Sequence, residues 1–215
     1  MDSFEIYKKL KENYLFSVIR GKTEENGKEI AEAVIAGGIK NIEVTFTTPG
    51  ALEIIRTLTK EYKNNQDIIV GAGTVNDITT ARLALLAGAK FIVSPVFQKD
   101  VAMLCNQYDS IYLPGCATPH EVLEALQYGV KVIKAFPGDI LTASFISDLK
   151  GPFPGVKIMP SGGVNLENLA MWIKKDAWAV GIGSDLSKGT NEIIKEKARK
   201  YVETTSAIRK ELYGV

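Results

Sequence analysis

The sequence is poor in the residues that build metal centres and disulfide frameworks. It has two cysteines, Cys105 and Cys116, and one histidine, His120, among 215 residues. No CxxC pair and no cysteine–histidine spacing occurs, so neither a disulfide framework nor a structural zinc site is indicated. We therefore expect no metal and no cofactor. Reduced thiols are the simplest interpretation of so few cysteines, and they predict a cytoplasmic protein.

Charge of one sign and long apolar runs are also lacking. Lysine and arginine total 26 against 25 aspartate and glutamate residues, so the net charge of +1 provides no basic field for nucleic acid or an anionic membrane. The N-terminus is charged throughout, and no run of about 18 apolar residues occurs, which excludes a signal peptide and a membrane-spanning helix. A hydrophobic content of 46% is nevertheless typical of a globular domain with a packed core.

What the sequence does contain is a regular alternation of strand-length apolar segments with helical segments. Strict alternation of this kind indicates βα units and a parallel sheet. The expected strands cover residues 15–19, 41–46, 68–72, 90–93, 110–113, 130–136, 156–159 and 177–182, and the expected helices cover residues 23–36, 50–62, 77–87, 99–107, 119–128, 142–150, 165–174 and 190–211.

The number of units favours a barrel. Eight βα units in about 200 residues suit a (β/α)₈ TIM barrel, and an open doubly wound sheet is the alternative. Three similar helix-to-strand junctions support the count, because Gly37-Gly38, Gly88 and Gly129 each stand where glycine ends a helix.

We expect a single domain over residues 1–215. An amphipathic helix within residues 1–14, with Phe4, Ile6, Tyr7 and Leu10 at helical spacing, is expected to cover one end of the barrel. Residues 15–189 are expected to form the barrel and residues 190–215 a C-terminal helix.

A lysine interrupts the apolar segment that ends in Phe136-Pro137. Side chains alternate along a strand, so Val132, Lys134 and Phe136 share one face. A desolvated lysine loses its proton more easily and can form a Schiff base with a ketone. The alternative is a lysine that only forms an ion pair with an inward carboxylate.

Glu43 interrupts the second strand as Lys134 interrupts the sixth. The parity of residues 41–46 places Glu43 and Thr45 on the same face, which can be the barrel interior. Schiff-base chemistry needs a proton shuttle beside the amine, and a carboxylate in a closed site can supply it. A buried Lys134–Glu43 ion pair without catalysis is the alternative.

Glycine-containing loops follow the last two strands. In a barrel the chemistry lies at the C-terminal ends of the strands, and the loops after strands seven and eight commonly bind phosphate through backbone N–H groups. Ser161-Gly162-Gly163 and Gly181-Ile182-Gly183-Ser184 occupy these places, which predicts a phosphate monoester on the substrate. Glycines that only form tight turns are the alternative.

Three further candidates carry weaker signals. Gly71-Ala72-Gly73-Thr74 resembles half of a dinucleotide fingerprint but lacks its third glycine and its acidic partner, so NAD is not expected. Thr74 is a candidate hydroxyl donor to a small carboxylate, or simply the start of a turn. Thr118-Pro119 begins a helix, which makes His120 a helix-start residue. Cys116 is expected in the core, because nothing nearby would activate its thiol.

Together these motifs resemble a known family, the 2-dehydro-3-deoxyphosphogluconate (KDPG) / 4-hydroxy-2-oxoglutarate (KHG) aldolases. The resemblance runs from about Phe16 to Ser184, with motifs in the same order at seven of the eight strand ends. It rests on Glu43-Val44-Thr45, Gly71-Ala72-Gly73-Thr74-Val75, Pro114-Gly115, Lys134 before Phe136-Pro137, and Ser161-Gly162-Gly163-Val164.

The resemblance implies a metal-free class I aldolase, usually trimeric, on a (β/α)₈ barrel. Lys134 would form the Schiff base with pyruvate, Glu43 would be the acid and base, and Thr74 would lie at the pyruvate carboxylate. The implied phosphate-binding residues are Gly162, Gly163, Gly183 and Ser184.

The sequence departs from the family pattern at the expected carboxylate site. The family often has an arginine four residues after the glutamate, where this chain has Thr47. Arg20, at the end of the first strand, is a replacement cation, and Thr47 can still donate a hydroxyl. Ser161 stands where threonine is common and is expected to contact the substrate.

The resulting expectation is cleavage of a 2-keto-3-deoxy-6-phospho sugar acid of the phosphogluconate type to pyruvate and glyceraldehyde 3-phosphate. Alternatives are cleavage of 4-hydroxy-2-oxoglutarate or of the phosphogalactonate epimer, and a phosphosugar isomerase or epimerase. A phosphosugar-binding module is the non-enzyme alternative. Expected partners are the phosphorylated keto acid, pyruvate and two further copies of the chain in a homotrimer.

Overall fold

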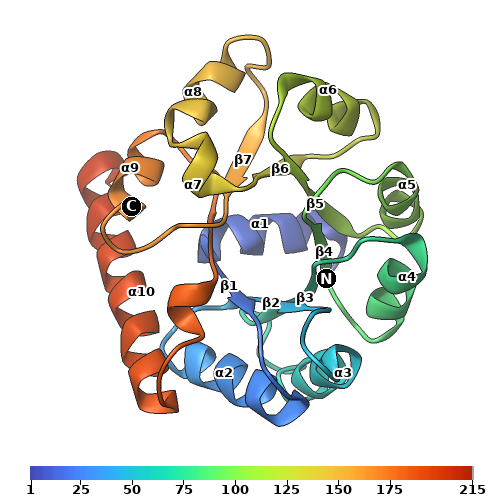
Figure 1. Ribbon diagram of the computed structural model, residues 1–215, viewed down its shortest axis with the longest axis vertical. Helices are drawn as coiled ribbons and strands as arrows, with labels where there is room; N and C mark the ends of the chain where they lie inside the picture. Colours follow the sequence, from blue (N-terminus) through green and yellow to red (C-terminus); the bar gives the residue numbers. More distant parts are fainter. Residues whose placement is uncertain (215) are drawn as a thin grey trace.

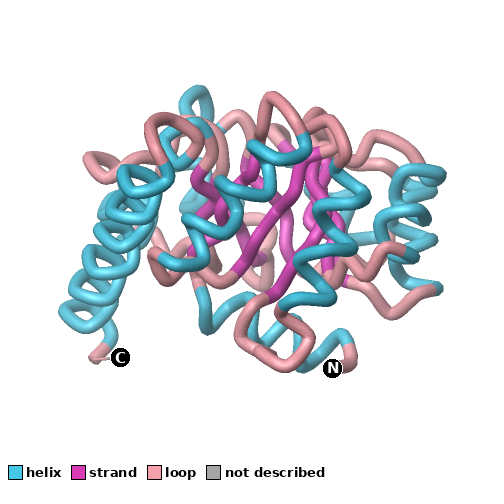
Figure 2. Tube along the Cα trace, turned by 90° about the horizontal axis from the view of Figure 1, so that it is seen from below, coloured by secondary structure: helices cyan, strands magenta, loops and turns pink. Residues whose placement is uncertain are grey.

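A computed structural model describes residues 1–214 and shows eight parallel strands surrounded by helices (Figures 1 and 2). Neighbouring strands pair in the order β7-β6-β5-β4-β3-β2-β1-β8, so each strand lies beside its sequence neighbours and β8 returns to β1. The strands are β1 (Leu15–Ile19), β2 (Asn41–Thr45), β3 (Ile69–Gly73), β4 (Phe91–Ser94), β5 (Ile111–Cys116), β6 (Val132–Ala135), β7 (Lys157–Pro160) and β8 (Val180–Ile182).

The sheet closes on itself between β7 and β8. Ser161 and Gly181 form a parallel bridge there, and the Trp178 N–H donates to the Ile158 carbonyl at 2.8 Å. An open sheet would leave these two strands as separate edges. The structure therefore confirms the TIM barrel and excludes the doubly wound alternative.

Helices alternate with the strands around the outside, as the sequence predicts (Figure 1). Side chains of Asp2, Thr23, Asp77, Thr118 and Thr190 accept hydrogen bonds from the first turns of their helices. The helices are α1 (Ser3–Asn13), α2 (Glu24–Ala36), α3 (Ala51–Glu61), α4 (Ile78–Leu86), α5 (Lys99–Gln107), α6 (Pro119–Gln127), α7 (Gly138–Leu141), α8 (Ser144–Lys150), α9 (Leu169–Lys174), the 3₁₀ helix η1 (Ser184–Leu186) and α10 (Asn191–Tyr213).

Several expected boundaries are wrong. The expected strand over residues 130–136 is shortened to β6, because Val130 still hydrogen-bonds back to Ala125 of α6 and Phe136 precedes a proline. One helix was expected at residues 142–150, but a short α7 precedes α8. The expected helix at 165–174 begins only at Leu169, because Asn165 and Asn168 form a side-chain-bonded turn.

The N-terminal helix α1 covers the N-terminal end of the barrel, below the strands in Figure 2. Ile6 and Leu10 pack in one apolar cluster with interior residues such as Phe16, Phe91 and Met159. This agrees with the expected covering role, with one exception: Phe4 is 71% exposed and does not join the cluster. The N-terminal part of the barrel interior is therefore filled with apolar side chains.

The C-terminal helix α10 lies alongside α2 and α9 on the outside of the barrel (Figure 1). The expected C-terminal segment included Val215, which lies outside the described residues. In residues 1–214, no helix has the length and apolar character needed to cross a membrane.

Truncating Leu10 tests the contribution of α1. Leu10 is fully buried, so Leu10→Ala should lower the free energy of unfolding by roughly 2–4 kcal/mol, measured by urea denaturation. Phe4→Ala is the matched control, and it should change stability by less than about 0.5 kcal/mol because Phe4 is exposed. Equal losses in both variants would contradict this packing of α1.

Candidate active site

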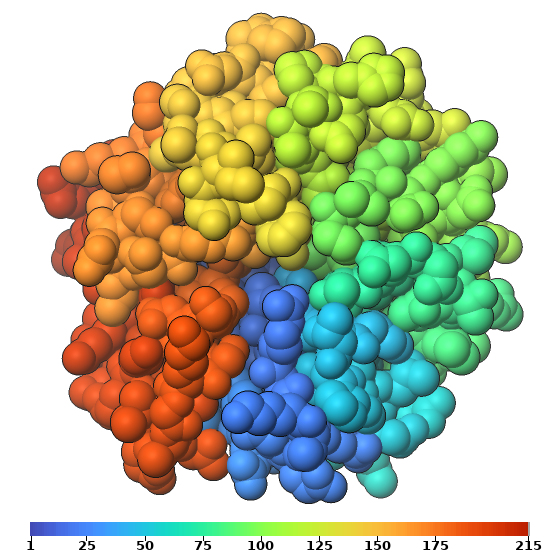
Figure 3. Space-filling model, viewed as in Figure 1, coloured from blue at the N-terminus to red at the C-terminus, as the bar shows by residue number. Residues whose placement is uncertain are grey.

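A cavity of about 570 Å³ opens at the C-terminal ends of the strands. Figure 3 shows its mouth near the middle of this face, where blue, yellow and orange segments meet. Of the ten predicted site residues, nine line this cavity and only Thr47 does not. The nine are Arg20, Glu43, Thr74, Lys134, Ser161, Gly162, Gly163, Gly183 and Ser184.

Lys134 and Glu43 face each other across the barrel interior. Nζ of Lys134 lies 3.6 Å from Oε1 of Glu43, and the two residues are 6% and 0% exposed. Charge-assisted hydrogen bonds are usually about 2.7–2.9 Å long, so this is an ion pair without a formed hydrogen bond. Neither carboxylate oxygen has a hydrogen-bond partner in residues 1–214. The amine and the carboxylate are therefore close, desolvated and uncommitted to other side chains.

Two glycines of β3 explain how these side chains fit. A Cβ at Gly73 would lie 2.2 Å from Oε1 of Glu43, and one at Gly71 would lie 2.5 Å from the Phe91 ring. Both glycines therefore make room for neighbouring side chains inside the barrel. Their role is close packing, and their position in a strand interior gives no phosphate cradle of the dinucleotide kind.

The β6 end places Lys134 against an aromatic ring. Its ammonium lies 5.2 Å from the centre of the Phe136 ring, which also lines the cavity. On β5, Gly115 pairs with Lys134, and a Cβ there would overlap the Pro95 carbonyl oxygen. This glycine lets the β4 loop approach beside the lysine.

The loop after β7 turns through two glycines in the left-handed region. Gly162 has φ of +86° and Gly163 of +74°, which residues with a Cβ rarely adopt. The Asn168 side-chain amide donates to the Gly163 carbonyl at 2.8 Å and fixes the turn. In residues 1–214, no backbone hydrogen bond outside helices and strands uses the N–H of Gly162 or Gly163. These donors remain available to an anion.

The loop after β8 offers two more donors. Gly183 lines the cavity with φ of −106°, and Ser184 begins η1, where the first N–H groups of a helix lack partners. None of the backbone bonds described for residues 1–214 takes the N–H of either residue. The two loops thus bring four backbone donors to one side of the cavity, the arrangement that suits phosphate.

A threonine network joins the ends of β1 and β2 on both sides of Arg20. Thr45 donates its hydroxyl to the Ile19 carbonyl at 2.8 Å, and the Gly21 N–H donates to the Thr48 hydroxyl at 3.1 Å. Residues on both sides of Arg20 are therefore anchored, while its side chain lines the cavity. The Thr47 hydroxyl lies 3.0 Å from that of Thr45, within this network.

Thr74 has a backbone conformation that is unusual for its residue type. Its φ of +56° lies in the left-handed region, where a β-branched residue is a genuine outlier. Such strain is most often found at functional sites. Thr74 lines the cavity together with Glu43 of β2 and Pro95, which follows β4.

Two residues that the sequence analysis placed outside the site, Cys116 and His120, do lie outside the cavity, and several lining residues were not predicted. Cys116 is buried, and burial raises the pKa of its thiol to about 12, which makes it a core residue. His120 is exposed at the start of α6. The unpredicted lining residues belong to no recognisable motif, so the sequence did not indicate a role for them. Lys188 is the exception, because it lies close enough to the end of the eighth strand to have been considered. The missed lining residues are Val18, Pro95, Phe136, Val164, Ser187 and Lys188.

Substitution of Gly73 tests the close fit around Glu43. Gly73→Ala should lower the free energy of unfolding by roughly 1–3 kcal/mol, because the added methyl overlaps the carboxylate. Gly155→Ala is the matched control, since a Cβ at Gly155 meets nothing within 4 Å. Urea denaturation compares them. If both variants unfold at the same urea concentration, Gly73 is not what makes room for Glu43.

Comparisons with known proteins agree with this geometry. The family model described as KDPG and KHG aldolase matches residues 6–204. The 2-dehydro-3-deoxy-phosphogluconate aldolase of Treponema pallidum is 36% identical over 169 residues, which are 78% of this chain and 79% of the relative.

Two solved structures are also similar. A native KDPGal structure is 28% identical with a TM-score of 0.84 and covers 90% of this chain and 95% of its own. The KDPG aldolase of Legionella pneumophila, with pyruvate captured as a covalent carbinolamine, is 29% identical with a TM-score of 0.79, covering 87% and 93%. The chain therefore belongs to the KDPG and KHG aldolase family and is a class I aldolase, a lyase that acts through a carbinolamine with pyruvate.

Proposed function

We propose that this aldolase cleaves a 2-keto-3-deoxy-6-phospho sugar acid of the phosphogluconate type to pyruvate and glyceraldehyde 3-phosphate. The observation that carries the proposal is the buried Lys134–Glu43 pair, 3.6 Å apart, in a cavity bordered by two glycine loops with available N–H groups. The pair suits carbon–carbon cleavage next to a ketone, and the loops suit a phosphate at the far end of the substrate.

Lys134 is the proposed nucleophile. Its neutral amine attacks the C2 ketone to give a carbinolamine, which loses water to form an iminium ion. The C3–C4 bond then breaks, and its electron pair moves into the iminium to give an enamine. Protonation at C3 and hydrolysis release pyruvate and regenerate the amine. Lys134 is 6% exposed and lines the cavity, so its amine lies where a bound ketone can be attacked.

Glu43 is the proposed acid and base. Removal of the C4 hydroxyl proton releases the aldehyde, and return of a proton to C3 completes pyruvate formation. A carboxylate within 4 Å of the lysine Nζ lies within reach of atoms bound to it. Neither carboxylate oxygen has a hydrogen-bond partner in residues 1–214, so both are available for proton transfer.

The substrate carboxylate is assigned to Arg20, with Thr74 and Ser161 as hydroxyl donors. Arg20 lines the cavity, whereas Thr47, in the usual arginine position, does not. A guanidinium can bind a carboxylate through two parallel hydrogen bonds, which a threonine cannot replace. In this proposal Thr47 acts only within the network that anchors the ends of β1 and β2.

The phosphogalactonate epimer is the second candidate substrate, favoured by the similarity to the native KDPGal structure. The two substrates differ in configuration at C4, beside which Glu43 is proposed to act. The isomerase, epimerase and binding-module alternatives do not agree with membership of an aldolase family. Activity toward 4-hydroxy-2-oxoglutarate remains the phosphate-free alternative, which the second experiment below tests.

We also propose a homotrimer that acts in the cytoplasm. Exposed apolar side chains on the neighbouring helices α4 and α5, Ile78, Leu83, Leu86 and Met103, support self-association. The two cysteines are buried and unpaired, in keeping with a reducing compartment.

Borohydride reduction in the presence of pyruvate tests the nucleophile. A single covalent pyruvate adduct should form, and peptide mass spectrometry should locate it on Lys134.

Glu43→Gln tests the proposed acid and base. It keeps the shape of the side chain, so it should still trap pyruvate but lose at least about a hundredfold in kcat for cleavage. An adduct on Lys131 or Lys22, or full activity of Glu43→Gln, would remove the corresponding residue from the mechanism.

Substitution in the β8 loop tests the phosphate site. Gly183 has φ of −106°, and the only atom within 4.0 Å of a Cβ added there would belong to Val18. Gly162 has φ of +86°, so Gly162→Ala would add backbone strain. Gly183→Ala is thus the cleaner variant. Blocking one N–H donor should lower kcat/KM for the phosphorylated keto acid by about 10- to 100-fold.

The control for that variant is a substrate without phosphate. Pyruvate trapping and cleavage of 4-hydroxy-2-oxoglutarate should stay nearly unchanged in Gly183→Ala. If wild type shows no preference for phosphorylated substrate, or the variant loses both activities equally, the phosphate-free alternative replaces the proposal.

A further inference from the structure

We propose that Lys188 determines specificity for the phosphorylated substrate, by placing its ammonium against the phosphate dianion that the glycine loops hold. This inference rests on the proposed function and adds a side chain to it. Backbone N–H groups carry only partial charges, and a dianion beside them gains from a full positive charge nearby.

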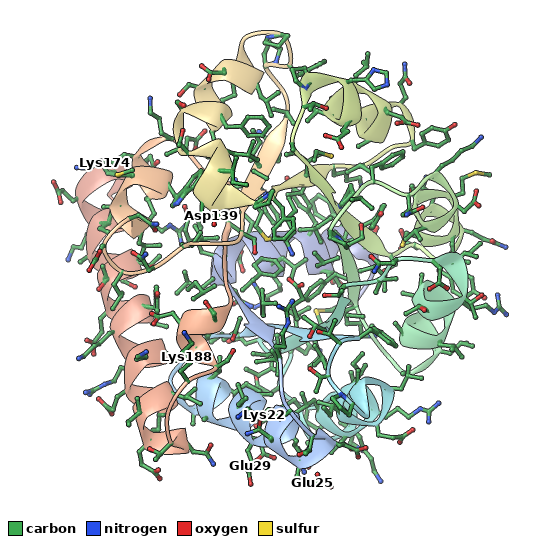
Figure 4. The ribbon with its side chains drawn as sticks, in the orientation of Figure 1. Lys22, Glu25, Glu29, Asp139, Lys174 and Lys188 are labelled. Carbon is green, nitrogen blue, oxygen red and sulfur yellow. The ribbon has the colours of Figure 1, made fainter. Side chains whose placement is uncertain are left out.

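The position of Lys188 connects it with the phosphate loops. Lys188 is the second residue after η1, and it lines the same cavity as Gly162, Gly163, Gly183 and Ser184. Figure 4 shows it at the end of η1, on the face where the cavity opens. Lysine has a flexible four-carbon stem, so its ammonium can follow an anion within the cavity.

The neighbouring carboxylate, Asp185, is held mainly by α10 and not by Lys188. Asp185 accepts hydrogen bonds from the Tyr201 hydroxyl at 2.7 Å and from Nζ of Lys197 at 3.0 Å, both on α10. Partial burial opposes its ionisation, but these two donors, with a smaller contribution from the charge of Lys188, lower the pKa of Asp185. The charge of Asp185 is thus balanced mainly by α10.

No ion pair within 4.0 Å involves Lys188 in the part of the chain that the structure describes. Arg20, which also lines the cavity, follows β1 and is assigned to the carboxylate end of the substrate. The two cations are therefore divided: Arg20 serves the carboxylate, and Lys188, in the segment of Ser184, serves the phosphate.

The test compares Lys188→Gln with two matched variants. Lys188→Arg keeps the charge, and Lys22→Gln removes an exposed lysine over the start of α2 that does not line the cavity (Figure 4). Each is assayed on 2-keto-3-deoxy-6-phosphogluconate and on its unphosphorylated counterpart. Lys188→Gln should lose roughly tenfold or more in kcat/KM on the phosphorylated compound, mainly in KM. Its activity on the other compound should change less than twofold.

The two matched variants and the salt dependence distinguish recognition of the phosphate charge from a structural role of Lys188. Lys188→Arg should recover most of the loss, and Lys22→Gln should resemble wild type. Raising the ionic strength should reduce the preference of wild type for the phosphorylated compound, and Lys188→Gln should respond much less. A purely structural role for Lys188 would not give this difference between substrates.

Other results would overturn the assignment. Lys188 does not recognise phosphate if Lys188→Gln loses kcat/KM equally on both substrates, or if Lys22→Gln loses as much as Lys188→Gln on the phosphorylated compound. In either case, pyruvate trapping at Lys134 would leave the proposed chemistry intact. A wild-type enzyme without preference for phosphorylated substrate would instead reject the phosphate site itself, and this inference with it.

Discussion

The buried contact between Lys134 and Glu43 is the constraint on which the rest of the barrel depends. An ammonium and a carboxylate withdrawn from water cost free energy that an isolated ion pair rarely recovers, and here no hydrogen bond within residues 1–214 supports the carboxylate. The proposed mechanism explains their retention, because an uncommitted amine beside an uncommitted carboxylate is the combination that Schiff-base cleavage requires. The barrel must hold both side chains in place from opposite strands.

The surrounding glycines are the means by which the barrel holds them. Gly73 leaves space for the Glu43 carboxylate, and Gly115 lets the β4 loop approach beside Lys134. The N-terminal half of the interior is filled with large apolar side chains and covered by α1. Packing is thus dense where the barrel needs stability, and small residues are concentrated where it needs room for a substrate.

Much of the fold and part of the site could be predicted from the sequence, for physical reasons. Period-two and period-3.6 patterns and helix caps are local, so eight βα units could be counted and Lys134 and Glu43 placed on inward faces. The ends of β6 and α9 were misjudged, because side-chain turns and proline decide them. The packing role of Gly73 depends on a contact between β3 and the Glu43 side chain of β2, which no single-sequence pattern contains.

The cover formed by α1 also determines how molecules can travel through the enzyme. The N-terminal part of the interior is filled with apolar side chains, and the cavity that Lys134 lines opens at the C-terminal ends of the strands. A substrate therefore enters and leaves at the same end of the barrel. In the proposed mechanism, the pyruvate half of the substrate stays attached to Lys134 after the carbon–carbon bond breaks. The aldehyde therefore departs before pyruvate, and the order of product release follows from the covalent bond together with the closed end of the barrel.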